Sequence, residues 1–221
     1  MQEKTNNTGT PSAVPVNRVI CYIDGFNLYF GMREKRWRKY YWLDIHKFAL
    51  SLLKPGQQLA AVRYFTSRVS STPSDPDQNK RQNVYLEALA TLKDTSLYFG
   101  HYLSKPVKCN KCGAVWMKQE EKMTDVNIAM ELLVDSYEDR FDTAILVTAD
   151  SDLTGPIMKV RGHYPEKKVI VAFPPARISE RLKRTATGWR NVGQDSLRQN
   201  QLPDPVIKLG GHELRRPVEW R

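Results

Sequence analysis

Residues 142–153 read DTAILVTADSDL, and this stretch indicates both the fold and the place of a functional site. The apolar, β-branched run Thr143 to Thr148 predicts a buried strand. Leu153 to Arg161 follows with the spacing of a helix. Asp150 and Asp152 therefore belong to the turn that joins the end of a strand to the start of a helix.

The same alternation of strand and helix runs along most of the chain. The helix at 125–137 has so few polar residues that we expect it to be well buried. The predicted strands are 18–23, 59–69, 96–103, 143–148 and 168–173, and the predicted helices are 26–34, 45–53, 78–93, 125–137, 153–161 and 178–186. This pattern is typical of an α/β fold with a mostly parallel sheet of about five strands, in which ligands bind at the carboxyl ends of the strands.

Composition and chain organisation favour one globular domain. The chain has 221 residues, 41% hydrophobic and 26% charged, which is enough for a single α/β core. We predict a flexible leader at 1–16, the domain at 17–190 with an irregular insert at 105–122, and a tail at 191–221. The leader lacks the apolar core of a signal peptide, and the apolar runs are too short for a membrane span.

Charge and cysteine content narrow the setting. The 34 Lys and Arg residues outnumber the 24 Asp and Glu residues, for a net charge of +10. Such an excess favours a polyanionic partner, although a generally basic surface explains it too. Three cysteines do not form a disulfide framework, so we expect a reducing, cytoplasmic location.

Acidic residues gather at the predicted strand ends. Asp24 ends the first strand, Asp150 and Asp152 follow the fourth, and Asp125 opens a helix. We expect these four carboxylates to share one edge of the sheet, where a Mg²⁺ or Mn²⁺ ion would relieve their repulsion and activate water. Asn27, Thr148 and Ser151 would orient ligands around them.

Each acid also has a purely structural interpretation. Asp24-Gly25 alone would suit a turn. Asp125 and Asp152 would each suit the N-cap of the helix that follows.

Three runs resemble one known family. YIDGFNLYF (22–30), KMTDVNIAMELL (122–133) and DTAILVTADSDL (142–153) are similar, in this order, to the NYN domains of the PIN-like ribonuclease superfamily. The resemblance covers about residues 18–190. It implies a three-layer α/β/α fold and a metal-dependent RNA endonuclease, with family acids at Asp24, Asp125, Asp150 and Asp152 and the family asparagine at Asn27. Ala149 stands where glycine is common in the family.

A basic and aromatic stretch, REKRWRKYYW (33–42), follows the first acid. Cations bind phosphates and aromatic rings stack on unpaired bases, so we expect Arg33, Arg36, Arg38 and Lys39 to contact single-stranded or structured RNA. The alternative is a solvated loop with its aromatic rings in the core, as expected for Trp42. A second basic set, interpreted as a solvated helix face, comprises Arg177, Arg181, Lys183 and Arg184.

Cys109 and Cys112 form a C-x-x-C motif that supplies two of the four ligands of a zinc ion. The sequence has no second such motif. Zinc shared between two subunits, a vestigial knuckle and a reducible cysteine pair all stay open, and the insert and tail offer surfaces for a homodimer.

Two other functions compete with the ribonuclease. One is a non-catalytic RNA-binding or regulatory protein on the same fold, against which the intact acid set argues. The other is a phosphatase of the aspartyl-phosphate type, which needs a second early aspartate that Asp24-Gly-Phe-Asn lacks.

Overall fold

The computed structural model describes residues 16–221, apart from the side chains of residues 101–105 and 116–122. Residues 1–15, which make up nearly all of the predicted leader, lie outside the described chain. In the part that is described, no helix is both long and apolar enough to cross a membrane.

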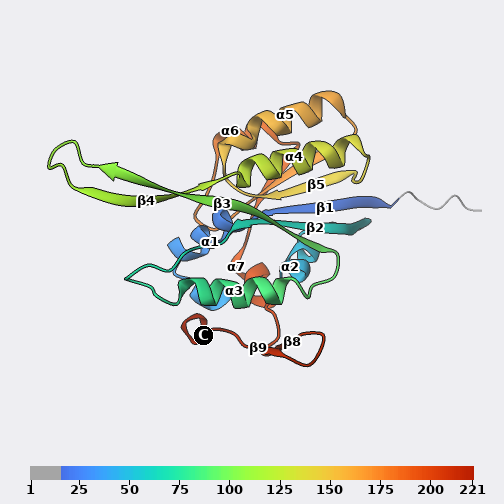
Figure 1. The fold of residues 1–221 in the computed structure, drawn as a ribbon. Coiled ribbons are helices and arrows are strands. Elements are labelled where there is room, and N and C mark those ends of the chain that lie inside the picture. The colour runs from blue at the N-terminus through green and yellow to red at the C-terminus, as the bar shows by residue number, and fades with distance from the viewer. Residues whose placement is uncertain (1–15) are drawn as a thin grey trace, which may run out of the picture.

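A seven-stranded sheet forms the centre of the molecule, in the order β4-β3-β2-β1-β5-β6-β7 (Figure 1). Neighbouring strands run parallel except for β4, which is antiparallel to β3. The predicted mostly parallel sheet is therefore confirmed, extended by β4 and β7. The strands are β1 (Asn17–Asp24), β2 (Gln57–Ser67), β3 (Thr95–Lys108), β4 (Val115–Lys122), β5 (Thr143–Val147), β6 (Lys168–Phe173) and β7 (Gly188–Asn191).

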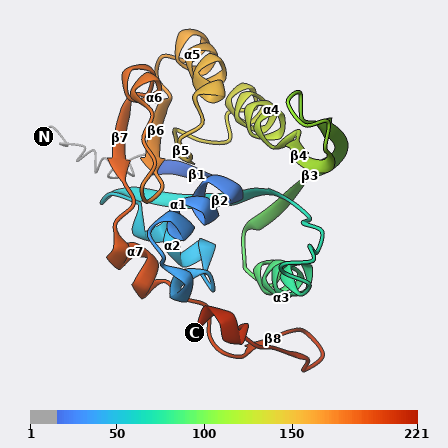
Figure 2. The same cartoon turned by 90° about the vertical axis from the view of Figure 1, so that its left-hand side faces the viewer.

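Helices cover both faces of the sheet and complete the three predicted layers (Figures 1 and 2). One face carries α1 (Gly25–Glu34), α2 (Ile45–Ser51), α3 (Gln78–Leu89) and α7 (Gln194–Gln199). The other carries α4 (Thr124–Tyr137), α5 (Thr154–His163) and α6 (Glu180–Thr185). Short 3₁₀ turns are η1 (Arg38–Tyr40), η2 (Ser151–Leu153) and η3 (Val218–Trp220), and a small hairpin joins β8 (Val206–Ile207) to β9 (Glu213–Leu214).

Strand β1 lies at the point where the chain changes direction across the sheet. Its neighbour on one side is β2, and on the other it is β5. Ile23 at the end of β1 is the register partner of Val147 at the end of β5. The carboxyl ends of these two strands are thus side by side, and a crevice at such a switch point is where open α/β sheets bind ligands.

Alternation along β1 explains why this strand is buried on both faces. Cys21 and Ile23 pack into the core beneath α1 and α2. Ile20 and Tyr22 pack into the core beneath α4 and α5. Successive side chains of a strand point to opposite faces, so a continuous apolar run fits a strand covered by helices on both sides.

The C-x-x-C insert is a β-hairpin and not the irregular segment that we predicted. Strands β3 and β4 pair in continuous antiparallel register from His101–Lys122 to Lys108–Val115, and the hairpin projects from the body (Figure 1). At its tip the Cys109 amide donates to the Ala114 carbonyl at 2.8 Å. A polar segment forms strands here because each backbone supplies the other's hydrogen bonds.

Helix α4 is less buried than we predicted. Ile128 and Leu132 face the sheet, with 1% and 0% of their surface exposed. On the outer face, Val126, Met130, Leu133 and Val134 are between 39% and 56% exposed. A helix that covers a sheet buries only one stripe, so apolar residues on its other side stay in contact with water.

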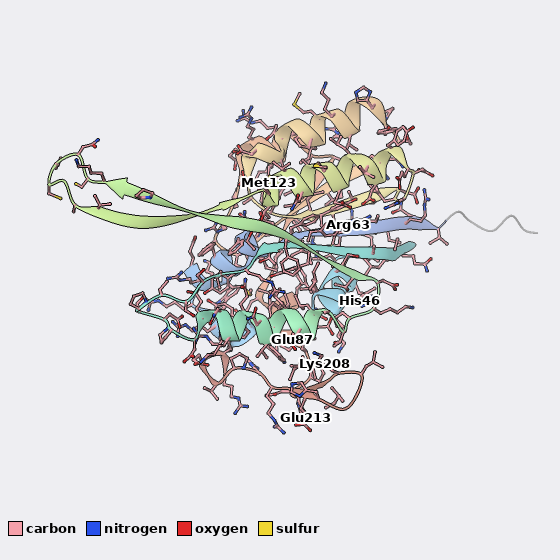
Figure 3. All side chains as sticks on the ribbon, in the orientation of Figure 1. His46, Arg63, Glu87, Met123, Lys208 and Glu213 are labelled. Atoms are coloured by element: carbon pink, nitrogen blue, oxygen red, sulfur yellow. The ribbon has the colours of Figure 1, made fainter. Side chains whose placement is uncertain are left out.

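The segment after β7 folds back onto the α1–α3 side of the sheet. The Trp42 indole donates to the Pro203 carbonyl at 2.9 Å, and Lys208 forms an ion pair of 2.9 Å with Glu87 of α3 (Figure 3). Trp220 packs on the ring of Trp42, with 6.4 Å between ring centroids. The last residues of the chain therefore contribute to the surface above α1 and α3.

Candidate metal centre

Asp24 lies at the carboxyl end of β1, with only 2% of its surface exposed. Its Oδ1 accepts the Asn27 amide at 2.9 Å, so the same side chain caps α1. Its Oδ2 accepts from Asn27 Nδ2 at 2.5 Å and from Thr148 Oγ1 at 3.0 Å. The carboxylate is thus held in one orientation by α1 and by the end of β5, although burial raises its pKa.

The other three predicted acids come together above it. One carboxylate oxygen from each of Asp125, Asp150 and Asp152 lies within 4.8 Å of the other two. Asp125 is on the first turn of α4, whereas Asp150 and Asp152 are in the turn after β5. Asp24 is outside this group of three but interacts with it electrostatically. The charge of Asp24 raises the pKa of Asp125, and the charge of Asp150 raises the pKa of Asp24.

Asp125 does not cap the helix on which it lies. The N-cap of α4 is Met123, whose φ is +80°, and Asp125 makes no hydrogen bond or ion pair among the described residues. Burial and the charges of Asp150, Asp24 and Asp152 raise its pKa to about 6. A half-buried carboxylate without a donor, next to three other carboxylates, lacks a positive partner.

These donors fit a hard divalent cation. All are carboxylate oxygens, which Mg²⁺, Mn²⁺ and Ca²⁺ prefer over nitrogen and sulfur. Asp150 is held by accepting the Asp152 amide at 2.9 Å, and Thr148 accepts the Asp150 amide at 3.1 Å. The Thr148 hydroxyl therefore connects Asp24 to Asp150 and fixes their relative position.

Arg177 belongs to this neighbourhood, although we had assigned it to a solvated helix face. It precedes α6, in the loop after β6, and is 30% exposed at its side chain. Its guanidinium donates to Asn27 at 3.4 Å and to Glu34 at 2.8 Å, and its Nε is buried without a partner. The signal in the sequence was its place just beyond the carboxyl end of a strand, at the same edge as the acids.

The basic stretch divides between surface and core. Arg33, Arg36, Arg38 and Lys39 are all exposed, and Arg33 is on the last turn of α1. Tyr40 and Trp42 are buried in the core and are not available to stack on a base. Arg33 and Arg38 line a cavity of about 520 Å³ on the α1–α3 side of the sheet.

The C-x-x-C motif lies at the tip of the β3–β4 hairpin. Hydrogen bonds from the Cys112 and Lys111 backbones and the Cys112 side chain lower the pKa of Cys109. Cys112 is exposed. Among the described side chains, no third ligand joins the two thiols, so zinc binding here stays a prediction.

Neutralising one acid is expected to stabilise the metal-free protein. The pKa of Asp125 is raised from 3.8 to about 6, so its ionised carboxylate destabilises the folded protein. This destabilisation is absent below pH 3.8, grows as the pH rises through 6 and is complete at pH 8. In EDTA at pH 8, Asp125→Asn should therefore raise the free energy of unfolding by about 1–2 kcal/mol, a value reduced because the side chain is partly exposed. Urea unfolding measures it.

Asp139→Asn is the matched control, because ion pairs with Lys167 and Arg18 lower the pKa of Asp139. This variant should lose stability under the same conditions. If both variants changed the free energy of unfolding in the same direction, the proposed repulsion among the clustered acids would be contradicted.

Two comparisons by sequence relate the chain to known proteins. The family model for the NYN domain matches residues 18–191. A curated relative, "6-hydroxy-3-succinoylpyridine 3-monooxygenase HspA" from Pseudomonas putida, is 30% identical, across 92% of this chain and 75% of its own.

A solved structure shares the fold at low sequence identity. It is a crystal structure of a protein of unknown function from Vibrio parahaemolyticus, which is 17% identical with a TM-score of 0.51 over 84% of this chain and 96% of its own. The match to the family model spans the sheet, both helical layers and all four acids. The chain therefore belongs to the NYN domain family of the PIN-like ribonuclease superfamily.

Proposed function

We propose that this protein is a metal-dependent ribonuclease that cuts within RNA chains. The observation that carries the proposal is the convergence of Asp125, Asp150 and Asp152 at the switch point of the sheet. These residues would hold Mg²⁺ or Mn²⁺, with Asp24 below them as a further ligand or as the group that positions the others. The bound ion supplies an activated water and stabilises charge on the phosphate.

The remaining residues of the edge would handle the RNA strand. Asn27 contacts Asp24 and Arg177 contacts Asn27, and both side chains can donate to phosphate oxygens. The exposed cations Arg33, Arg36, Arg38 and Lys39 lie on the last turn of α1 and just after it, and they would bind the strand as it leaves the edge. The net charge of +10 supports a polyanionic substrate.

A cleavage assay tests the proposal. Purified protein is incubated with end-labelled single-stranded and hairpin RNAs in Mg²⁺, in Mn²⁺ or in EDTA. Internal cuts that need the metal are expected. A protein that binds RNA in Mn²⁺ but leaves every RNA intact would instead be a non-catalytic RNA-binding or regulatory protein, the alternative on the same fold.

The Pseudomonas relative supports a second candidate. Its name describes a monooxygenase that acts on 6-hydroxy-3-succinoylpyridine, and the similarity spans 92% of this chain. We propose as the alternative that this chain oxygenates a hydroxypyridine acid. The test supplies such an acid, O₂ and a two-electron reductant, and measures consumption of all three; no consumption would remove this candidate.

A further inference from the structure

A cavity of about 520 Å³ lies on the α1–α3 side of the sheet, close to the acids but separate from them. Its walls come from α1, η1, β2, α3 with the segment leading into it, and η3. Helices α1 and α3 are far apart in sequence and lie on the same face of the sheet (Figure 2). The cavity is in the size range of small-molecule pockets.

Aromatic rings form much of the wall. Tyr41 and Tyr85 each meet Trp220 edge to face, with ring centroids 5.7 Å and 5.9 Å apart. Tyr29 packs against Tyr41 at 4.9 Å. The Tyr85 hydroxyl donates to the Leu43 carbonyl at 2.9 Å, which fixes that ring further. Rings held in this way are already arranged to pack on a flat ligand.

The acidic residues of the lining are all held in ion pairs. Asp75 and Glu219 both pair with Arg81, and Asp77 pairs with Lys80 at 2.8 Å. Asp75 and Glu219 share one cation, so one negative charge of these pairs remains, and it lies at Arg81.

Two cations of the lining have no such partner. Arg33 and Arg38 make no ion pair among the residues whose side chains are described, and both act electrostatically on the Tyr41 hydroxyl. Guanidinium groups bind carboxylates and phosphates through paired donors. These two unpaired cations thus favour an anion at Arg33 and Arg38.

The cavity also adjoins the acid edge. Gly25, which follows Asp24 directly, lines it together with Tyr64 of β2. A Cβ atom on Gly25 would be 2.6 Å from the Tyr64 hydroxyl, so only glycine allows this close approach. Asp24 thus lies next to the wall of the cavity, and a ligand inside it would reach toward the acids.

We propose that this cavity binds one planar aromatic ring that carries an anionic group. The ring would lie against Tyr29, Tyr41 and Trp220, and the anion would lie at Arg33 and Arg38. In RNA this ligand is a nucleotide beside the cleaved phosphate, with its base in the cavity; this assignment rests on the proposed ribonuclease function. A free aromatic carboxylate has the same chemistry and is the other source.

Calorimetric titration in EDTA tests the site without the metal. The probes are AMP, adenosine, ribose 5-phosphate and nicotinate. AMP and nicotinate each combine an aromatic ring with an anionic group, and at least one of them should bind. Adenosine and ribose 5-phosphate should bind about tenfold more weakly than AMP, because each lacks half of the recognised chemistry. Tighter binding of AMP identifies a nucleotide site, whereas tighter binding of nicotinate identifies a site for a free aromatic acid.

Variants locate the binding. Arg33→Met combined with Arg38→Met should lower the affinity for the probe that binds by at least about tenfold, and Trp220→Leu should lower it by about the same factor. Lys35→Met is the matched control, since Lys35 is an exposed cation beside the same helix that does not line the cavity. Its affinity should equal that of the wild type, and circular dichroism checks that each variant is folded.

Three results would overturn the inference. These are no binding of either AMP or nicotinate at millimolar concentration, measurable but equal binding of adenosine and AMP, or binding that survives loss of both arginines in a folded protein. Because the titrations contain no metal, they are independent of RNA cleavage. Failure of the ribonuclease assay would leave the cavity chemistry intact, and failure here would leave metal-dependent cleavage to be judged separately.

Discussion

Replacing Asp150 with asparagine is expected to lower metal-dependent RNA cleavage by about a thousandfold, with RNA binding retained. Asparagine keeps the shape and one oxygen of the side chain, so the hydrogen bond that Oδ1 accepts from the Asp152 amide can persist. The negative charge is lost from the group of three carboxylates, and with it much of the attraction for the cation. Gel-based cleavage rates and an RNA binding assay measure the two effects separately.

The matched control is Asp195→Asn on α7. Asp195 is an exposed acid that, within the described part of the chain, pairs only with Arg198, so cleavage should be unchanged. Calorimetric titration with Mn²⁺ should show binding to the control and wild type, and weaker binding to Asp150→Asn. Undiminished cleavage by Asp150→Asn combined with Asp125→Asn would show that the acids are not the catalytic centre.

The largest expected effect on stability belongs to Asp135 of α4. Its carboxylate is completely buried and accepts from Tyr22 Oη at 2.5 Å and from Arg63 Nε at 2.6 Å. Asparagine would turn an amide toward these donors and leave the buried Arg63 charge with Glu131, which is 27% exposed at its side chain, as its remaining counterion (Figure 3). We expect Asp135→Asn to cost about 3–5 kcal/mol, which corresponds to a fall in Tm of about 10 °C for a domain of this size.

The comparison is an ion pair in contact with water. Lys208→Ala removes the pair with Glu87, whose members are 37% and 50% exposed at the side chain. This change should cost less than about 1 kcal/mol. Urea unfolding followed by fluorescence measures both variants, and a loss for Asp135→Asn no larger than that for Lys208→Ala would contradict the importance of the buried network.

The central strands and two of the acids could be predicted because their signals are local. Ile20 to Ile23 is apolar at every position, as a strand between two helical layers must be. Asp24 directly follows such a run, Asp150 comes three residues after the end of β5, and parallel strands bring their carboxyl ends to one edge. The position of Asp125 depended on family resemblance, since a helix start alone is explained equally well by capping.

Features that depend on distant partners could not be predicted. The segment 115–122 becomes a strand only because 101–108 pairs with it. Arg177 joins the acid edge through Asn27, which is 150 residues earlier. Trp220 closes the aromatic wall with Tyr41, and nothing near either residue indicates their contact. Such contacts follow from the packing of whole elements, which no short stretch of sequence specifies.

The central place of β1 has a consequence for how the protein tolerates fluctuations. This strand is hydrogen-bonded on both edges and covered on both faces, as is β5. Their amide hydrogens can exchange with solvent only through global unfolding, whereas the β3–β4 hairpin and the C-terminal hairpin can open alone. Asp24 and Asp150 are attached to the segments that open last. We therefore expect the distance between these two acids to stay constant while the surrounding surface, including the walls of the neighbouring cavity, opens and closes locally.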